Sequence, residues 1–129
     1  MTRRSARAGL STYVIGRDKA PEALRLGTVR HLPRGVRRED RGEYFDVWLP
    51  SLAPSRELLR WWLAGEPSEA RFTTFAKRYR REMDTSETRG TIALLAAAAV
   101  HMPVAIGCYC DRPQCHRVLL ERLIRDAMG

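Results

Sequence analysis

Two short segments of β-forming residues, separated by a long helical stretch, constrain the fold of this chain most strongly. Leu24–Val29 alternates between two faces, and Val104–Tyr109 is apolar and rich in residue types that favour buried strands. Strands that are joined through helices usually pair in parallel, because the crossover returns the chain to the same end of the sheet. We therefore expect an α/β fold, with a small parallel or mostly parallel sheet covered by helices in a single domain.

Three helices are expected between these two strands. Ser55 has the side chain of an N-cap for the first helix, which ends at Gly65. Aromatic and apolar residues recur at helical spacing in the second helix, which begins near Ser68. The third helix is capped by Ser86 and runs to about His101. Because each helix has one apolar face, we expect the three to cover the sheet.

The length of 129 residues fits one domain with a substantial core. Residues 1–10 are basic and small, so we expect a disordered arm there and the α/β domain over residues 11–129. Ser11–Ile15 is interpreted as a short strand or as part of an arm. Phe45–Pro50 has apolar residues at alternate positions, and we expect it to dock on the core as a short strand or turn.

The longest uncharged segment does not have the pattern of a membrane span. Thr91–Tyr109 has no charged side chain over 19 residues, but His101 and Pro103 divide it into a helix, a turn and a strand. The basic N-terminus is not followed by the apolar run of a secretory signal. We therefore expect a cytoplasmic protein with no membrane partner, in which an odd number of cysteines stays reduced.

Arginine dominates the charge of the chain. The formal net charge is +8, and 21 of the 23 basic residues are arginine. Guanidinium groups bind phosphate through paired hydrogen bonds, so one interpretation is an anionic partner such as a nucleotide or a nucleic acid. The other is a solvated surface, since 15 acidic residues are interleaved with the basic ones. Both interpretations stay open.

All three cysteines lie in one short segment, Cys108–His116, between the second strand and the last helix. Asp111 and Gln114 have the spacing of a capping box, which predicts that this helix begins near Asp111–Pro113. Cys115 is then in the first helical turn, where the helix dipole lowers the pKa of a thiol. The segment predicts a site but not its reaction.

Three functional hypotheses and a structural one fit this segment. In the first, Cys108, Cys110 and Cys115 bind zinc or iron, with His116 or the more distant His31 as a further ligand. In the second, Cys115 is a reactive thiol beside His116, and arginines orient an anionic substrate. In the third, the thiols only pack beside an anion or nucleotide pocket. In the structural hypothesis, the cysteines and His116 are core residues, because free Cys is often buried.

The loop after the first strand is the expected second half of the site. Ligands of parallel sheets bind beyond the carboxyl ends of the strands, so the loops Arg30–Gly35 and Cys108–His116 should share one edge. Arg34 and Arg117 are the expected anion ligands, and Gly35 allows the backbone to approach. The alternative for Arg34 is a salt bridge to a nearby acidic residue.

A set of short motifs lies in order along the chain, at Leu26–Arg30, Pro33–Val36, Phe45–Pro50, Leu52–Ser55, Arg78–Arg80, Cys108–Cys110 and Cys115–Arg117. As an ordered set they resemble the family known as domain of unknown function 488. The similarity covers about residues 24–127. The resemblance implies a small α/β domain from bacteria or archaea, with the Cys-His-Arg segment and the Pro-Arg-Gly loop as hallmark positions. It implies no settled activity.

These observations together lead us to expect a protein that binds an anionic small molecule or nucleotide and uses a reactive thiol. The alternative is a non-catalytic module that binds zinc, iron or nucleic acid. If the chain is an enzyme, its chemistry is thiol-dependent or metal-assisted and acts on an anionic substrate. The oligomeric state is open, because the three tryptophans and Met102 are compatible with a dimer without requiring one.

Overall fold

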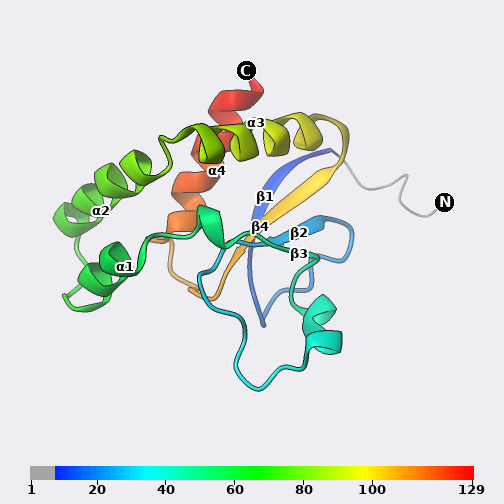
Figure 1. The fold of residues 1–129 in the computed structure, drawn as a ribbon, viewed down its shortest axis with the longest axis horizontal. Coiled ribbons are helices and arrows are strands. Elements are labelled where there is room, and N and C mark those ends of the chain that lie inside the picture. Colours follow the sequence, from blue (N-terminus) through cyan, green and yellow to red (C-terminus); the bar gives the residue numbers. More distant parts are fainter. Residues whose placement is uncertain (1–7) are drawn as a thin grey trace.

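Residues 8–129, the part of the chain that the computed structural model describes, form an α/β domain on a four-stranded parallel sheet (Figure 1). The strands are β1 (Gly9–Val14), β2 (Leu24–Gly27), β3 (Val47–Trp48) and β4 (Pro103–Cys108). Their spatial order is β1-β4-β2-β3, so β4, the last strand in the sequence, pairs with both β1 and β2. The expected single-domain fold with a parallel sheet is confirmed.

The helices follow the expected order, three between β3 and β4 and one after β4. They are α1 (Arg56–Leu63), α2 (Glu69–Glu82), α3 (Ser86–His101) and α4 (His116–Met128), with short 3-10 helices at Arg38–Glu43 and Pro50–Leu52. Ser55 caps α1 as expected, and Ser68, near which the second helix was expected to begin, caps α2; each side chain accepts a backbone N–H from three residues further on. Within the described range, each helix is too short or too polar to cross a membrane.

Several boundaries differ from the expectation, among them the start of α3 and the start of β1. Thr85, not Ser86, caps α3, because Thr85 and Thr88 each accept the other's backbone N–H at 3.2 Å in a capping box. At the other end of the chain, β1 begins at Gly9, inside the segment that was expected to be a disordered arm. Residues 1–7 of that expected arm lie outside the described residues.

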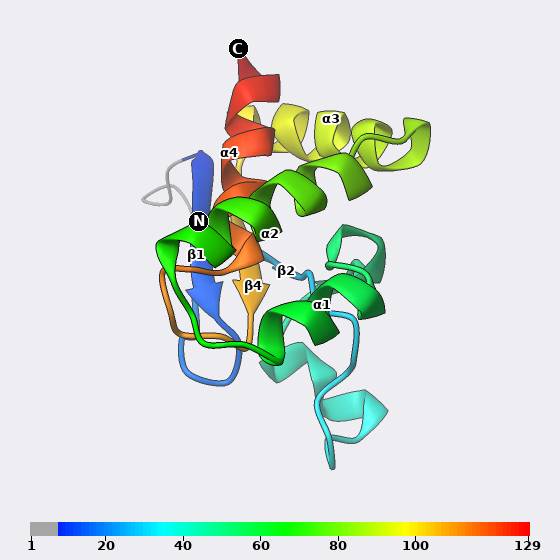
Figure 2. The ribbon, with the colours of Figure 1, turned by 90° about the vertical axis from the view of Figure 1, so that its left-hand side faces the viewer.

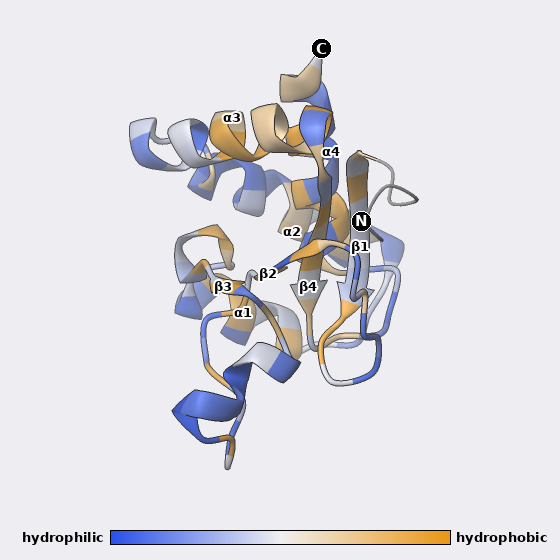
Figure 3. Ribbon diagram, turned by 90° about the vertical axis from the view of Figure 1, so that its right-hand side faces the viewer, coloured by the Kyte–Doolittle hydropathy of each residue, from blue (hydrophilic) through white to orange (hydrophobic). Residues whose placement is uncertain are grey.

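Helices cover one face of the sheet and connecting loops cover the other (Figure 2). On the helical face, Ile106 of β4 belongs to the main core, together with residues of α2, α3 and α4 such as Leu120. On the other face, Tyr13 and Phe45 form a second, smaller cluster. The 3-10 helix Arg38–Glu43 has no buried residue and lies at the end toward which the strands point, where Figure 3 shows it as hydrophilic.

Two glycines make the loop-covered face possible. Gly27 and Gly107 are directly paired between β2 and β4. A methyl group on Gly107 would lie 2.6 Å from the Tyr13 ring, and one on Gly27 would lie 2.7 Å from the Phe45 ring. Each aromatic ring therefore packs directly on strand backbone, and this close approach compensates for the absence of a helix on this face.

We predict that Gly107→Ala destabilises the protein by about 1–3 kcal/mol, the usual cost of overpacking a core. The added methyl group meets both the Tyr13 ring and, at 2.8 Å, Ile15. Gly90→Ala is the matched control: Gly90 lies within α3 with no atom within 4 Å of the new methyl group, so it should gain about 0.5–1 kcal/mol from helix propensity. Urea unfolding measures both, and equal midpoints for Gly107→Ala and the unsubstituted protein would contradict the packing argument.

Candidate functional site

The loops that follow β2 and β4 meet at the carboxyl end of the sheet, as the sequence predicts. β2 and β4 are parallel neighbours, and the chain after β2 passes through Thr28 and Val29 to His31. The hydroxyl group of Tyr109 donates a hydrogen bond to the carbonyl oxygen of His31, with 2.9 Å between the oxygens. This bond joins residues 78 positions apart, so two distant segments form one edge.

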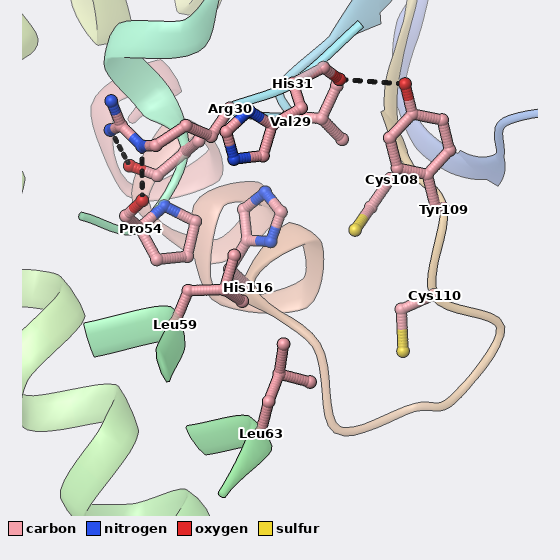
Figure 4. A pocket seen from close by; sticks show the side chains of 11 residues that line it. Val29, Arg30, His31, Pro54, Leu59, Leu63, Cys108, Tyr109, Cys110 and His116 are labelled. Atoms are coloured by element: carbon pink, nitrogen blue, oxygen red, sulfur yellow. Dashed lines mark hydrogen bonds between the residues drawn. The ribbon is translucent and has the colours of Figure 1, made fainter. Parts of the chain in front are cut away.

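A cavity of about 250 Å³ lies between these loops and α1 (Figure 4). Leu59 and Leu63 line it from α1, and Val29 lines it from the loop after β2. Cys108 and His116 line it from the end of β4 and the start of α4. The cavity is therefore mostly apolar, with sulfur and imidazole as its reactive groups.

Three soft ligand groups converge beside this cavity. The Sγ atoms of Cys108 and Cys115 and a ring nitrogen of His116 all lie within 4.8 Å of one another, and the three residues are buried. Cys108 is the last residue of β4, Cys115 is the N-cap of α4, and His116 is the first residue of that helix. We call these three residues the Cys/His cluster.

A loop joins the strand to the helix in place of the expected capped turn. Asp111 does not cap α4, because the Cys115 N–H binds the Pro113 carbonyl at 3.1 Å in a turn that precedes the helix. Cys110 lies in this loop, where its sulfur accepts the backbone N–H of Arg112 at 3.4 Å. Cys110 lines the cavity but lies outside the Cys/His cluster.

The imidazole of His116 is held in one orientation by the end of β2. Its Nε2 lies 2.7 Å from the Thr28 carbonyl oxygen, and since a carbonyl only accepts, Nε2 carries the hydrogen. The Thr28 hydroxyl group donates to the Gly107 carbonyl at 2.9 Å and lies 3.2 Å from the same Nε2. In the neutral ring, Nδ1 is therefore the acceptor, and it lies 3.8 Å from the sulfur of Cys115.

The pKa values of the two buried thiols are shifted in opposite directions, which corrects an expectation. The pKa of Cys108 is lowered, chiefly because the Cys115 thiol donates to its sulfur, and the backbone N–H of Cys110 adds to this effect against the opposing effect of burial. The same sulfur–sulfur hydrogen bond, followed by burial, raises the pKa of Cys115 to about 12. The expected lowering of the Cys115 pKa at the helix start is wrong, because this thiol is the donor to a second sulfur.

The expected anion ligands have different surroundings from one another. Arg117 is buried and donates to the Cys110 carbonyl, so its guanidinium holds the loop before α4. Arg34 and Gly35 are exposed and do not line the cavity. Arg30 does line it, and its Nε donates to the Pro54 carbonyl at 2.9 Å.

Sequence reasoning missed three residues of the site. Thr28 lies in the expected strand Leu24–Val29, and a hydroxyl residue in a mostly apolar strand was the available signal; the structure buries this residue fully. Leu59 and Leu63 lie in the first expected helix, and they line the cavity. His31, a weak metal candidate, lines the cavity too but lies outside the Cys/His cluster.

Comparison with known proteins assigns the chain to a family without assigning an activity. It is 29% identical over 92 residues to the uncharacterized protein Rv3073c of Mycobacterium tuberculosis and to the uncharacterized protein Mb3100c of Mycobacterium bovis, covering 71% of this chain and 72% of each relative. No solved structure matches the chain. A family model described as "Active DUF488-N3 subclade" matches residues 10–128. The chain therefore belongs to the family of domain of unknown function 488.

Proposed function

We propose that this protein is a thiol-dependent enzyme that acts on a small molecule in the cavity, with Cys108 as its nucleophile. One observation carries the proposal: Cys108 is the cysteine of the Cys/His cluster that lines the cavity, and it is also the thiol whose pKa is lowered. Cys115, the thiol that the sequence favoured, does not line the cavity. A ligand therefore meets the sulfur of Cys108 first.

The arrangement fits a displacement reaction through a covalent adduct. The electron pair of the Cys108 thiolate forms a bond to an electrophilic atom of the substrate. The leaving group departs with the electron pair of the broken bond, and the Cys115 thiol supplies its proton. Water or a second substrate then takes the group from Cys108, and its proton returns to Cys115.

His116 and Thr28 act as positioning residues in this scheme. The Thr28 carbonyl fixes the hydrogen on Nε2, which leaves Nδ1 as an acceptor 3.8 Å from the Cys115 sulfur. Such an imidazole accepts the Cys115 proton when the thiol has to be deprotonated; while that hydrogen is donated to Cys108, the imidazole only packs beside the Cys115 sulfur. The group that orients the His116 imidazole is therefore the backbone carbonyl of Thr28, where many catalytic histidines have a carboxylate.

We predict that iodoacetamide labels Cys108 at least about tenfold faster than Cys115 at pH 7, because only the thiolate reacts and each pKa unit changes its fraction tenfold. The rate at Cys108 should reach half its maximum at a lower pH than the rate at an ordinary exposed thiol, because its pKa is lowered. Peptide mass spectrometry follows each cysteine separately. Faster labelling of Cys115 than of Cys108 at pH 7 would refute the assignment.

A matched pair of variants tests the hydrogen bond between the two sulfurs. Cys115→Ala removes the donor to Cys108, so its labelling profile should move to higher pH. Cys115→Ser retains a hydroxyl donor and should move the profile less. Equal profiles in Cys115→Ala and the unsubstituted protein would show that this bond does not set the pKa of Cys108.

A second candidate function is metal binding, and the geometry of the Cys/His cluster favours it specifically. Zinc bonds of about 2.3 Å to sulfur and 2.05 Å to nitrogen, at tetrahedral angles, place those two ligand atoms about 3.6 Å apart. The Cys115 sulfur and His116 Nδ1 lie 3.8 Å apart. The hydrogen bond from Nε2 to the Thr28 carbonyl is also the kind of outer contact that orients a metal-bound imidazole.

Cys108, Cys115 and His116 would hold the ion, and three protein ligands would leave a fourth coordination position for water or substrate. A zinc ion held there would supply Lewis-acid chemistry and would bind both sulfurs as thiolates. The reactive thiol and the metal site are therefore alternative uses of one set of atoms.

We predict for the metal alternative that untagged protein contains about one zinc per chain, because two thiolates and an imidazole bind zinc strongly. Elemental analysis measures the content directly. Cys108→Ser should lose the metal, whereas the control Cys110→Ser should keep it, since Cys110 lies outside the cluster. Zinc-free protein that also fails to take up added zinc or cobalt(II) would remove this alternative and leave the thiol.

A further inference from the structure

A second hollow adjoins the cavity along the outer side of α1. Its lining includes His31, Leu59 and Leu63, which also line the cavity over the Cys/His cluster. It adds Arg56 and Arg60 from the same helix. The two hollows therefore lie side by side, one mostly apolar and the other bordered by guanidinium groups.

The spacing along α1 explains this division. Arg56, Leu59, Arg60 and Leu63 follow the i, i+3, i+4, i+7 pattern, so their side chains form one stripe along the helix. Leu58, on another face, is fully buried and anchors the helix to the core. The stripe is thus free to face a ligand, with leucines beside the thiol cavity and arginines beyond them.

The two arginines differ from those that hold the fold together. Arg30 and Arg71 donate to backbone carbonyls near α1, and Arg117 donates to the loop before α4. Among residues 8–129, the guanidinium groups of Arg56 and Arg60 have no hydrogen-bond or ion-pair partner, and the lining of both hollows contains no acidic residue. Their charge is therefore available to a bound anion.

From this arrangement we infer that the ligand is a small anion with an apolar body, whose body fills the cavity over Cys108 and whose carboxylate or phosphate binds Arg56 and Arg60. The inference rests on the proposed function, because it assigns the ligand of that same cavity. A volume of about 250 Å³ is at the lower end of ligand sites, which suits an aromatic ring or a short branched chain. Guanidinium groups bind carboxylate and phosphate alike through paired hydrogen bonds.

Calorimetric titration with phenylphosphate, benzoate and neutral benzamide tests the inference without using the reactivity of any thiol. We expect at least one of the two anions to bind about tenfold or more tightly than benzamide, and the tighter one identifies the preferred acid group. In the double variant Arg56→Gln, Arg60→Gln, that anion should bind no better than benzamide. The matched control Arg34→Gln, Arg38→Gln removes the same charge from two exposed positions in the segment between β2 and β3. This variant should bind the anion as tightly as the unsubstituted protein does.

Three results would overturn the inference: no binding of either anion, equal binding of benzamide and the anions, or unchanged anion binding in Arg56→Gln, Arg60→Gln. Loss of binding in Arg34→Gln, Arg38→Gln instead would move the anion site to the loop that the sequence favoured. The alkylation of Cys108 by iodoacetamide, a neutral reagent, stays a separate measurement. Slow alkylation with intact anion binding would end the thiol proposal and keep the anion site.

Discussion

The hydrogen bond from His116 to the Thr28 carbonyl is the contact on which the rest of the site depends. It joins the start of α4 to the end of β2 across 88 positions of sequence, and the Thr28 hydroxyl group extends it to the Gly107 carbonyl of β4. All of these groups are buried, where an unpaired polar atom is costly. One imidazole therefore fixes the spacing of two strands and a helix, and its own tautomer is fixed in return.

The segment that leads into α1, beside the Cys/His cluster, is fixed by side chains that donate hydrogen bonds to its backbone carbonyls. The Tyr79 hydroxyl donates to the Leu52 carbonyl at 2.7 Å, and Arg30 donates to the Pro54 carbonyl, so the segment that leads into α1 is fixed from two sides. Tyr79 also packs against the ring of His116, with centroids 5.8 Å apart. Tyr79 thus both fixes the segment that leads into α1 and supports the imidazole of His116, so a shift of Tyr79 would change both.

The fold could be predicted from sequence because its signals are local. Alternation at 24–29, the Ser55 cap and the apolar strand before Cys108 each specify one element, and the strand–helix–strand order then specifies parallel pairing. The meeting of the loops after β2 and β4 follows from that pairing alone. The family resemblance that the ordered motifs indicated is also confirmed. The family model matches residues 10–128, which is nearly the whole domain.

The chemistry of the site was harder to predict, because it depends on contacts between distant segments. A helix start lowers the pKa of a thiol only if no stronger partner is present, and the sulfur of Cys108 is such a partner for Cys115. No spacing in the sequence shows that these two sulfurs meet, that Cys110 is left out, or that Thr28 determines the tautomer of His116. Each depends on the exact path of the loop that Arg117 holds before α4.

The proton between the two sulfurs also connects the two candidate chemistries. In the thiol form, the hydrogen bond from Cys115 lowers the pKa of Cys108 and raises that of Cys115, so the pair loses its first proton from Cys108. A divalent ion would replace the proton on Cys115, take both sulfurs as thiolates and bind the lone pair of Nδ1 that Thr28 leaves free. The thiol pair and a metal-bound cluster both need an unprotonated Nδ1 on His116. The hydrogen bond from Nε2 to the Thr28 carbonyl favours that tautomer, so it is compatible with either state. A metal ion bound there would therefore compete with that proton, and its affinity would rise with pH as the proton is lost.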